Sequence, residues 1–267
     1  MPEGPECRRI GESLAKYLSY KKIESIEILS GRYAKKTPTG YHEFRSALPL
    51  KIAGVGVHGK FIYWILEKEY SIWNTLGMTG HWSFEETSHS RVKVVVSGTP
   101  VFFNDQRNFG TLKLVKGKEF LIDKLKSLGP DMLADDVEDS LFIERVRKKN
   151  KLNVCKVLMD QSILAGVGNY VKADSLWLAK ISPHRNVEDC SDEELKELNK
   201  SVKKVLRESF KTGGATIRSY KNLEGEIGQY SSRFLVYNRK MDPEGNGVVK
   251  EMTPDGRNTH WSPNIQK

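Results

Sequence analysis

The first residues of the chain could supply a nucleophile. Met1 is followed by Pro2, and a small second residue favours removal of Met1, which would leave a secondary amine at the N-terminus. An α-amino group has a pKa of about 7.7–8.0, so a useful fraction is neutral near pH 7 and can attack an electrophilic carbon. At C1′ of a sugar the product is an iminium ion. Glu3 could then supply or remove a proton as the sugar ring opens. Many proteins without such chemistry also begin with Met-Pro-Glu.

Two further segments have the residue types of a phosphate site. Lys60 directly precedes the predicted strand Phe61–Leu66, where its ammonium group could hold a phosphate. Residues 160–170 have the pattern of a helix end, a turn with two glycines, and a helix that starts at Asn169. The backbone N–H groups at such a start bind anions, and the Asn169 side chain can donate to the same phosphate. The alternatives are a solvated strand end for Lys60 and a plain turn between packed helices for 160–170.

The charge balance indicates a polyanionic partner. Lys and Arg number 43 against 34 Asp and Glu, a net charge of +9. Nucleic acid is favoured over a membrane, because there is no apolar run of about 18 residues and the opening does not match a signal peptide. We therefore expect a soluble, intracellular protein. Cys7, Cys155 and Cys190 are scattered and lie outside CxxC pairs, which argues against a disulfide framework and a zinc cluster and favours buried thiols.

The first half of the chain has the sequence pattern of a β-rich domain that is preceded by one helix. Apolar residues recur at helical spacing from Glu6 to Leu18, so an amphipathic helix should anchor the N-terminus. Seven short strands are predicted to follow, at Ile23–Leu29, Lys51–Val57, Phe61–Leu66, Ser71–Leu76, Val92–Val96, Val101–Asn104 and Thr111–Val115. Their number and length indicate a β-sandwich or a flattened barrel.

The pattern becomes helical near Pro130, where we expect a domain boundary. Helices are predicted at Asp139–Lys149, Lys151–Asp160, Asn169–Lys180 and Ser191–Lys211, the last with a capping box from Ser191 to Glu194. Strand signals return at Phe234–Tyr237, Val248–Met252 and Thr259–Trp261. The expected fold is a two-lobed α+β protein: a β-sandwich at 1–130, a helical domain at 131–232 and a β-ribbon at 233–267.

The whole chain resembles the formamidopyrimidine-DNA glycosylase and endonuclease VIII family. The opening Met1–Glu6 is similar to the family's first residues, and Gly166-Val167-Gly168-Asn169 is similar to its helix-two-turn-helix signature. The resemblance implies that Pro2 is the Schiff-base nucleophile, that Glu3 is the acid and base, and that Lys60 and Asn169 bind DNA phosphates. Gly4 is closer to the endonuclease VIII branch than to the branch with Leu at that position.

The same resemblance assigns two loops to the minor groove. Leu76–Gly80 is similar to the loop in which Met78 fills the gap left by an extruded base. Asp105–Gly110 is similar to a second loop, in which Arg107 contacts the orphaned partner base and Phe109 wedges beside it. Core packing is the alternative for a lone Met. Residues 218–230 would cover the lesion pocket, although a connector without chemical consequence has the same composition.

The C-terminus departs from the family pattern of a four-cysteine zinc finger. Val236–Lys240 aligns with the start of the finger, but Ser262 and Ile265 stand where the last cysteine pair would be, so no zinc can bind there. The chain is similar to members with a metal-free finger, and this similarity implies that Arg257 binds phosphate.

Apolar packing is expected to substitute for the metal in this finger. The residues that would provide it are Trp261, Val248 and Met252. His260 is interpreted as structural.

The resulting hypothesis is a bifunctional DNA glycosylase and abasic-site lyase that acts without a cofactor, as a monomer, on damaged DNA. Oxidised pyrimidines and ring-opened purines are the favoured substrates, by analogy within the family. Two alternatives stay open: a DNA-binding protein of the same fold without turnover, and a lyase specialised for abasic sites.

Overall fold

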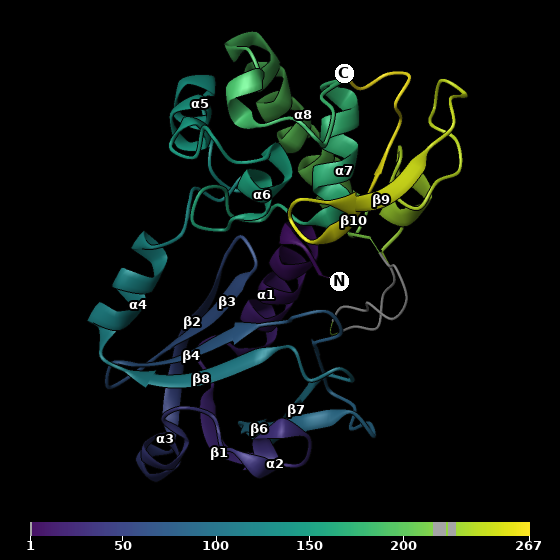
Figure 1. The fold of residues 1–267 in the computed structure, drawn as a ribbon. Helices are drawn as coiled ribbons and strands as arrows, with labels where there is room; N and C mark the ends of the chain where they lie inside the picture. Colours follow the sequence, from purple (N-terminus) through teal and green to yellow (C-terminus); the bar gives the residue numbers. More distant parts are fainter. Residues whose placement is uncertain (1, 216–222, 224–227) are drawn as a thin grey trace. The chain divides into compact units, whose positions relative to one another are not determined.

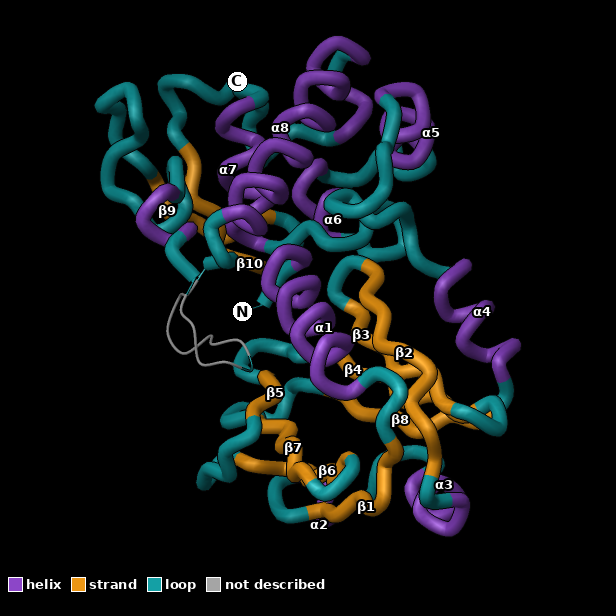
Figure 2. The backbone as a smooth tube through the Cα atoms, turned by 180° about the vertical axis from the view of Figure 1, so that it is seen from behind, coloured by secondary structure: helices purple, strands orange, loops and turns teal. Residues whose placement is uncertain are grey.

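The computed structural model describes residues 2–215, 223 and 228–267. They form two compact units, each of which combines separate stretches of the chain. The first contains Pro2, Glu6–Ser127 and the described part of Gly213–Gly228; the second contains Glu3–Pro5, Leu128–Thr212 and Gln229–Lys267. The main stretches of the two units meet between Ser127 and Leu128, close to the boundary expected at Pro130. Figure 2 shows that strands dominate the first unit and helices the second.

The first unit is a β-sandwich. In the described residues, one antiparallel sheet runs in the order β5-β7-β6-β1-β2-β3-β4-β8. Its strands are β1 (Lys22–Ile28), β2 (Leu50–His58), β3 (Phe61–Leu66), β4 (Tyr70–Thr75), β5 (His81–Ser83), β6 (Ser90–Val96), β7 (Thr99–Asn104) and β8 (Thr111–Lys116). The seven predicted strands are confirmed within a few residues at their ends. The short strand β5 was not predicted.

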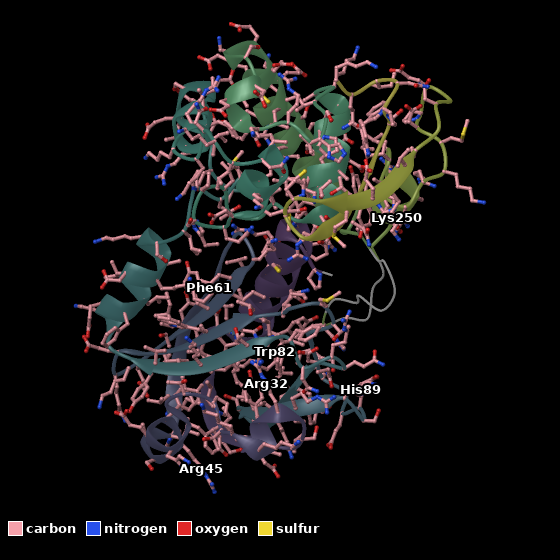
Figure 3. All side chains as sticks on the ribbon, in the orientation of Figure 1. Arg32, Arg45, Phe61, Trp82, His89 and Lys250 are labelled. Carbon is pink, nitrogen blue, oxygen red and sulfur yellow. The ribbon has the colours of Figure 1, made fainter. Side chains whose placement is uncertain are left out.

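The two halves of the sheet meet through an aromatic core. Trp64 on β3 and Trp82 on β5 come from opposite halves, and their ring centroids lie 5.1 Å apart. Phe103 on β7 lies 5.3 Å from Trp82, which Figure 3 labels. The indole N–H of Trp82 donates to Asn74 on β4 at 3.0 Å, so the one polar group of this buried ring has a partner.

Helices flank this sandwich. They are α1 (Gly4–Leu18), α2 (Arg32–Lys35), α3 (Tyr41–Ala47) and α4 (Lys118–Lys126). The apolar stripe of α1, which includes Ile10, Leu14 and Leu18, is buried in the core of the β-sandwich. The amphipathic N-terminal helix is therefore confirmed, and it starts two residues earlier than its periodicity indicates.

The second unit consists of helices and one β-hairpin. Its helices are α5 (Asp139–Arg147), α6 (Val154–Met159), α7 (Asn169–Leu178) and α8 (Asp192–Lys211), with 3-10 turns at Val187–Asp189 and Tyr230–Arg233. The capping box at the start of α8 is confirmed, because Ser191 accepts from the N–H of Glu194 at 3.1 Å and Glu194 accepts from the N–H of Ser191 at 2.7 Å. The helix ends before Gly213 and Gly214, which both have positive φ.

The strand predicted at Phe234–Tyr237 is wrong. This segment is an irregular stretch after the 3-10 turn. The buried carboxylate of Asp174 on α7 accepts hydrogen bonds from the backbone N–H groups of Leu235 at 3.1 Å and of Val236 and Tyr237 at 3.0 Å. Burial raises the pKa of Asp174 to about 6, although these three donors act in the opposite direction. A side chain thus satisfies the N–H groups that a neighbouring strand would otherwise pair.

The hairpin of β9 (Val249–Thr253) and β10 (Arg257–Trp261) lies beside α7 (Figure 1). A buried ion pair holds its turn: the Lys172 ammonium on α7 lies 2.6 Å from the Asp255 carboxylate, with the two side chains 0% and 3% exposed. Thr253 donates to the other oxygen of Asp255 at 2.6 Å. Although burial acts in the opposite direction, these donors hold the pKa of Asp255 below its usual value.

This anchoring differs from the packing expected around the hairpin. Val248 does pack against a cluster that includes Trp177 and Val236, but Met252 is 63% exposed and is not part of that cluster. Among the described residues, no group of three His, Cys, Asp or Glu side chains could hold a metal ion. The residues of this segment therefore do not fit a zinc site.

The cysteines and His260 are buried. All three cysteines are free thiols, as expected, and burial raises the pKa of Cys155 to about 12, which keeps it protonated and unreactive. His260 is 6% exposed and packs edge-on against Tyr237, with ring centroids 5.1 Å apart. Burial, and then the nearby ammonium groups of Lys250 and Lys172, lower the pKa of His260.

We expect the buried ion pair to behave as a unit in unfolding experiments. Removal of one partner leaves a buried charge without compensation, so Lys172→Met and Asp255→Ala should each lower the free energy of unfolding by about 3–5 kcal/mol. The double variant should lose much less than the sum of the two, because neither charge remains. Urea unfolding of the four proteins measures this coupling.

The exposed pair Lys148–Glu144 is the matched control. Its atoms are 2.8 Å apart, but its side chains are 57% and 61% exposed. Lys148→Met should therefore have the same free energy of unfolding as the wild type. If the double variant lost as much free energy of unfolding as the two single variants together, the buried pair would not hold the hairpin.

Candidate functional site

In the second unit, the carboxylate of Glu3 occupies the N-terminus of α7. Its two oxygens accept from the backbone N–H groups of Tyr170 at 2.9 Å and Val171 at 3.2 Å, and Glu3 is 1% exposed. The first N–H groups of a helix have no partner within it and carry a partial positive charge, so they suit a carboxylate. This corrects one expectation: the N–H groups assigned to a DNA phosphate already bind a residue of the chain.

Backbone contacts hold this arrangement at close range. The N–H of Gly4 donates to the carbonyl of Gly166 at 2.9 Å, and a Cβ on Gly4 would lie 3.0 Å from the Gly166 backbone. A Cβ on Gly168 would lie 2.1 Å from the carboxyl carbon of Glu3. The Gln161 side chain closes the turn, because it accepts from the N–H of Gly166 at 3.0 Å and donates to the carbonyl of Val167 at 3.0 Å. A side chain at position 168 would therefore displace the Glu3 carboxylate, and one at position 4 would crowd the Gly166 backbone.

The structure gathers the other predicted residues of the second unit around Tyr237. Asn169 donates to the carbonyl of Asn258 at 3.0 Å, which ties the start of α7 to the hairpin strand that begins at the exposed Arg257. Burial, and then the charge of Glu3, raise the pKa of the Tyr237 hydroxyl, while Asn169 and Arg257 act in the opposite direction. Glu3, Asn169 and Arg257 thus share one neighbour.

Tyr237 and Gly168 have structural roles here that sequence reasoning missed. Tyr237 was interpreted only as part of a strand, and Gly168 only as a turn residue. The available signal was weak: an aromatic hydroxyl in an apolar run, and a glycine immediately before a helix start. Neither pattern shows which residue lies opposite until the chain is folded.

In the first unit, the two loops assigned to the minor groove are joined. The Thr79 hydroxyl donates to the Asp105 carboxylate at 2.5 Å and accepts from the N–H of Arg107 at 3.0 Å. The other oxygen of Asp105 accepts from the N–H of Gly110 at 2.7 Å. Gly77 has a φ of 60°, and a Cβ there would lie 2.6 Å from the nitrogen of Gly110. Backbone contact and one buried carboxylate therefore fix both loops together.

These loops present their predicted residues outward. Met78 is 37% exposed and Phe109 is 54% exposed, so core packing does not explain either side chain. The Arg107 guanidinium carbon lies 4.8 Å from the centroid of the Phe109 ring, which orders both side chains. Asn108, between them, has a positive φ of 57°. Apolar side chains and a cationic side chain thus project from the two joined loops.

The remaining predicted residues are placed as follows. Pro2 is buried and directly precedes Glu3, and Lys60 is half-buried after Gly59 in the turn between β2 and β3, where Gly59 has a φ of 57°. Residues 1, 216–222 and 224–227 lie outside the described residues, and they include most of the segment 218–230 that was predicted to cover a lesion pocket. None of the helices in the described part of the chain is long and apolar enough to cross a membrane.

Two family models match the chain. The Formamidopyrimidine-DNA glycosylase N-terminal domain matches residues 1–112, and the Formamidopyrimidine-DNA glycosylase H2TH domain matches residues 128–221. The class of protein is thus a β-sandwich domain combined with a helical H2TH domain. The chain belongs to the formamidopyrimidine-DNA glycosylase family.

Two bacterial relatives are similar to this chain over its full length. The chain is 32% identical to formamidopyrimidine-DNA glycosylase of Oceanobacillus iheyensis, covering 100% of this chain and 98% of the relative. The same enzyme of Bacillus subtilis is also 32% identical, with 100% and 99% covered.

Solved structures show the same fold. The MutM (FPG) protein of Thermus thermophilus has a TM-score of 0.88 at 28% identity, with 99% of this chain and 98% of that chain covered. A mutant FPG of Lactococcus lactis, in complex with a Fapy-dG-containing DNA, has a TM-score of 0.89 at 27% identity, with 100% of both chains covered.

Proposed function

We propose that this protein excises oxidised bases through a Schiff base on Pro2 and then cleaves the strand by β- and δ-elimination. As a member of its family it is a DNA glycosylase of base excision repair with abasic-site lyase activity. The finer proposal rests mainly on one observation. The residue next to the candidate amine, Glu3, has its carboxylate held by two N–H groups of α7.

The proposed reaction uses few groups of the chain. The Pro2 nitrogen bonds to C1′ of a flipped nucleotide, and the bond from C1′ to the base breaks. Glu3 protonates the ring oxygen as the sugar opens, which leaves an iminium ion. The iminium makes the C2′ proton acidic, so the 3′ phosphate and then the 5′ phosphate leave by elimination and a one-nucleotide gap remains.

The other site residues are proposed to hold damaged DNA. Lys60, Asn169 and Arg257 would contact phosphates around the lesion, while Met78, Arg107 and Phe109 would fill the space left by the extruded nucleotide. The outward projection of Met78 and Phe109 supports the second group.

Substrate preference is the finest part of the proposal. We propose oxidised pyrimidines and ring-opened purines as substrates, with the protein in the endonuclease VIII-like branch and with a metal-free finger. The branch assignment rests on Gly4 itself, which packs against the Gly166 backbone closely enough that a Cβ would lie 3.0 Å away. The buried pair of Lys172 and Asp255, in place of metal ligands, supports the metal-free finger.

Borohydride trapping tests the nucleophile. The Met1-processed protein should form a reduced covalent adduct with a duplex containing thymine glycol and with one containing an abasic site, and peptide mapping should place both adducts on Pro2. Lys36→Met, which removes an exposed lysine, is the control and should trap normally. An adduct on the abasic duplex alone would favour the specialised lyase. Binding without an adduct on either duplex would favour the DNA-binding protein without turnover.

Gly168→Ala tests the placement of Glu3 without removing a reactive group. The added methyl group should displace the Glu3 carboxylate, and a shift of about 1 Å can cost about 100-fold in rate. We expect a comparable loss in single-turnover base excision, with abasic-site binding retained.

Gly247→Ala is the matched control for this change, because no atom lies within 4 Å of the added Cβ. It should excise bases at the wild-type rate. If Gly168→Ala were equally active, the position of Glu3 would have no role in catalysis.

Met78→Ala tests the minor-groove loop. Loss of the wedge should slow excision by about tenfold, the equivalent of about 1.4 kcal/mol of lost contact, with little change in thermal stability because Met78 is partly exposed. Met252→Ala, which removes a more exposed methionine on the hairpin, is the control. Equal rates for the two variants would remove Met78 from the proposed site.

A further inference from the structure

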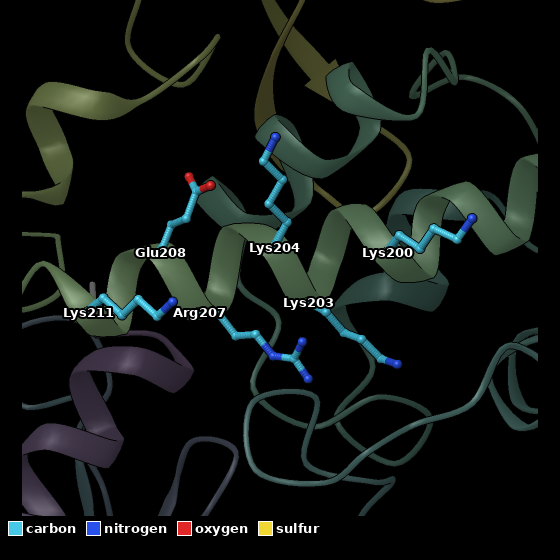
Figure 4. A pocket seen from close by; sticks show the side chains of 6 residues that line it. All are labelled: Lys200, Lys203, Lys204, Arg207, Glu208 and Lys211. Carbon is cyan, nitrogen blue, oxygen red and sulfur yellow. The ribbon is translucent and has the colours of Figure 1, made fainter.

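Helix α8 carries a strongly basic face that none of the proposed site residues explains. We define the basic face of α8 by six residues that line one hollow: Lys200, Lys203, Lys204, Arg207, Glu208 and Lys211. Figure 4 shows these side chains projecting from successive turns of the helix. Five cations and one carboxylate therefore share a single surface.

The spacing of the cations follows the helix. The charged positions recur every three or four residues, which keeps them on neighbouring turns of one side. From Lys200 to Lys211 the helix rises by about 16 Å, at about 1.5 Å per residue. The opposite side of α8, which includes Leu198, Val202 and Leu206, is fully buried. The fold of the second unit therefore fixes the direction in which the basic face points.

Acidic neighbours do little to neutralise this face. Lys200 lies 3.8 Å from Glu197, and Lys203 lies 3.7 Å from Asp136, whose side chain is 92% exposed. Both pairs are long and each has a solvent-exposed carboxylate, so they hold little energy, although the Lys203 side chain itself is only 16% exposed. Within the described part of the chain, the exposed side chains of Lys204, Arg207 and Lys211 have no ion pair.

Compensation of the helix dipole explains only part of the pattern. The favourable effect of cations is limited to the last turn of a helix. It therefore accounts for Lys211 and for one neighbouring turn at most. Lys200, Lys203 and Lys204 stand earlier in α8, where the dipole gives them no reason to be basic.

The chemistry of the face selects among anionic partners. A helix that binds a membrane surface places apolar side chains into the lipid, but the apolar side of α8 is buried in its own unit. Protein partners are usually held by aromatic or apolar anchors, and the six lining residues include none. A duplex carries a phosphate about every 3.4 Å along each strand, so a row of about 16 Å can lie beside several phosphates.

We propose that the basic face of α8 binds the phosphate backbone of duplex DNA, as a second contact surface besides the residues proposed for base excision. This proposal rests on the proposed function in one respect only, namely that the polyanion bound by the protein is DNA. It needs neither the Pro2 chemistry nor any particular lesion. Contacts of this kind carry no sequence information, so the surface would hold undamaged duplex as well as damaged duplex.

The test uses the full-length triple variant Lys204→Gln, Arg207→Gln and Lys211→Gln. Its affinity for an undamaged duplex, measured by fluorescence anisotropy over a series of salt concentrations, should fall by about tenfold or more at low salt. The slope of log affinity against log salt should decrease by about 3, because each lost phosphate contact removes about 0.9 from it. Single-turnover excision at saturating enzyme should be unchanged, because these residues do not touch the reacting atoms.

A second triple variant tests whether the loss of affinity depends on where the three charges lie or only on how many are removed. Lys35→Gln, Lys36→Gln and Lys118→Gln remove the same charge from exposed residues of the first unit and should keep the wild-type slope. An equal loss in both triple variants, or no loss in the α8 variant, would overturn the proposal. So would an α8 variant that loses binding to phosphatidylserine vesicles but keeps its affinity for DNA. A failure of Pro2 trapping leaves this comparison intact, since binding is measured without turnover.

Discussion

The two hydrogen bonds from the first turn of α7 to the Glu3 carboxylate are the contact on which the candidate site depends. They bring the second residue after the N-terminal methionine into the helical unit, although most of α1 packs in the β-sandwich. The contact needs a helix start without bulk, and Gly168 provides it. A carboxylate held in this way has a fixed orientation, as a group that moves protons requires. The position of Pro2, its neighbour in the chain, is restricted by the same contact.

Helix α7 organises the rest of its unit by a similar principle. Lys172 and Asp174 are fully buried, and each binds a segment distant in sequence: Lys172 the hairpin turn, Asp174 the backbone of 235–237. Trp177 adds a third link, because its indole N–H donates to Asp242 at 3.2 Å. Burial of charge is costly unless each charge is paired or hydrogen-bonded, and here both are. The hairpin that carries Arg257 is thereby held to α7 by the buried ion pair of Lys172 and Asp255.

The positively charged side chains of this protein have different roles. Some cations are committed to structure, such as Lys172, and others project from rigid supports, such as Arg107 beside Phe109. The basic face of α8 belongs to neither group. Four of its five cations are exposed and Lys203 is half-buried, and the helix that carries them is anchored by a fully buried apolar side. A net charge of +9 indicates a polyanionic partner, but only the folded chain shows which cations are free to meet one.

By itself, the sequence determined the strands of the sandwich and the helices with their capping box, because these follow from local periodicity and turn chemistry. Pro2, Glu3 and Asn169 were candidates from their residue types, and Met78 was a candidate from the resemblance to the family. Tertiary structure decided what lies opposite each residue. It placed Glu3 on two backbone N–H groups of α7 that were expected to face a phosphate. It also replaced the strand at 234–237 with backbone held by Asp174, and it exposed Met252 where packing was expected. The reason is physical: a buried N–H, carboxylate or ammonium group must find a partner, and that partner is often more than 60 residues away in the chain.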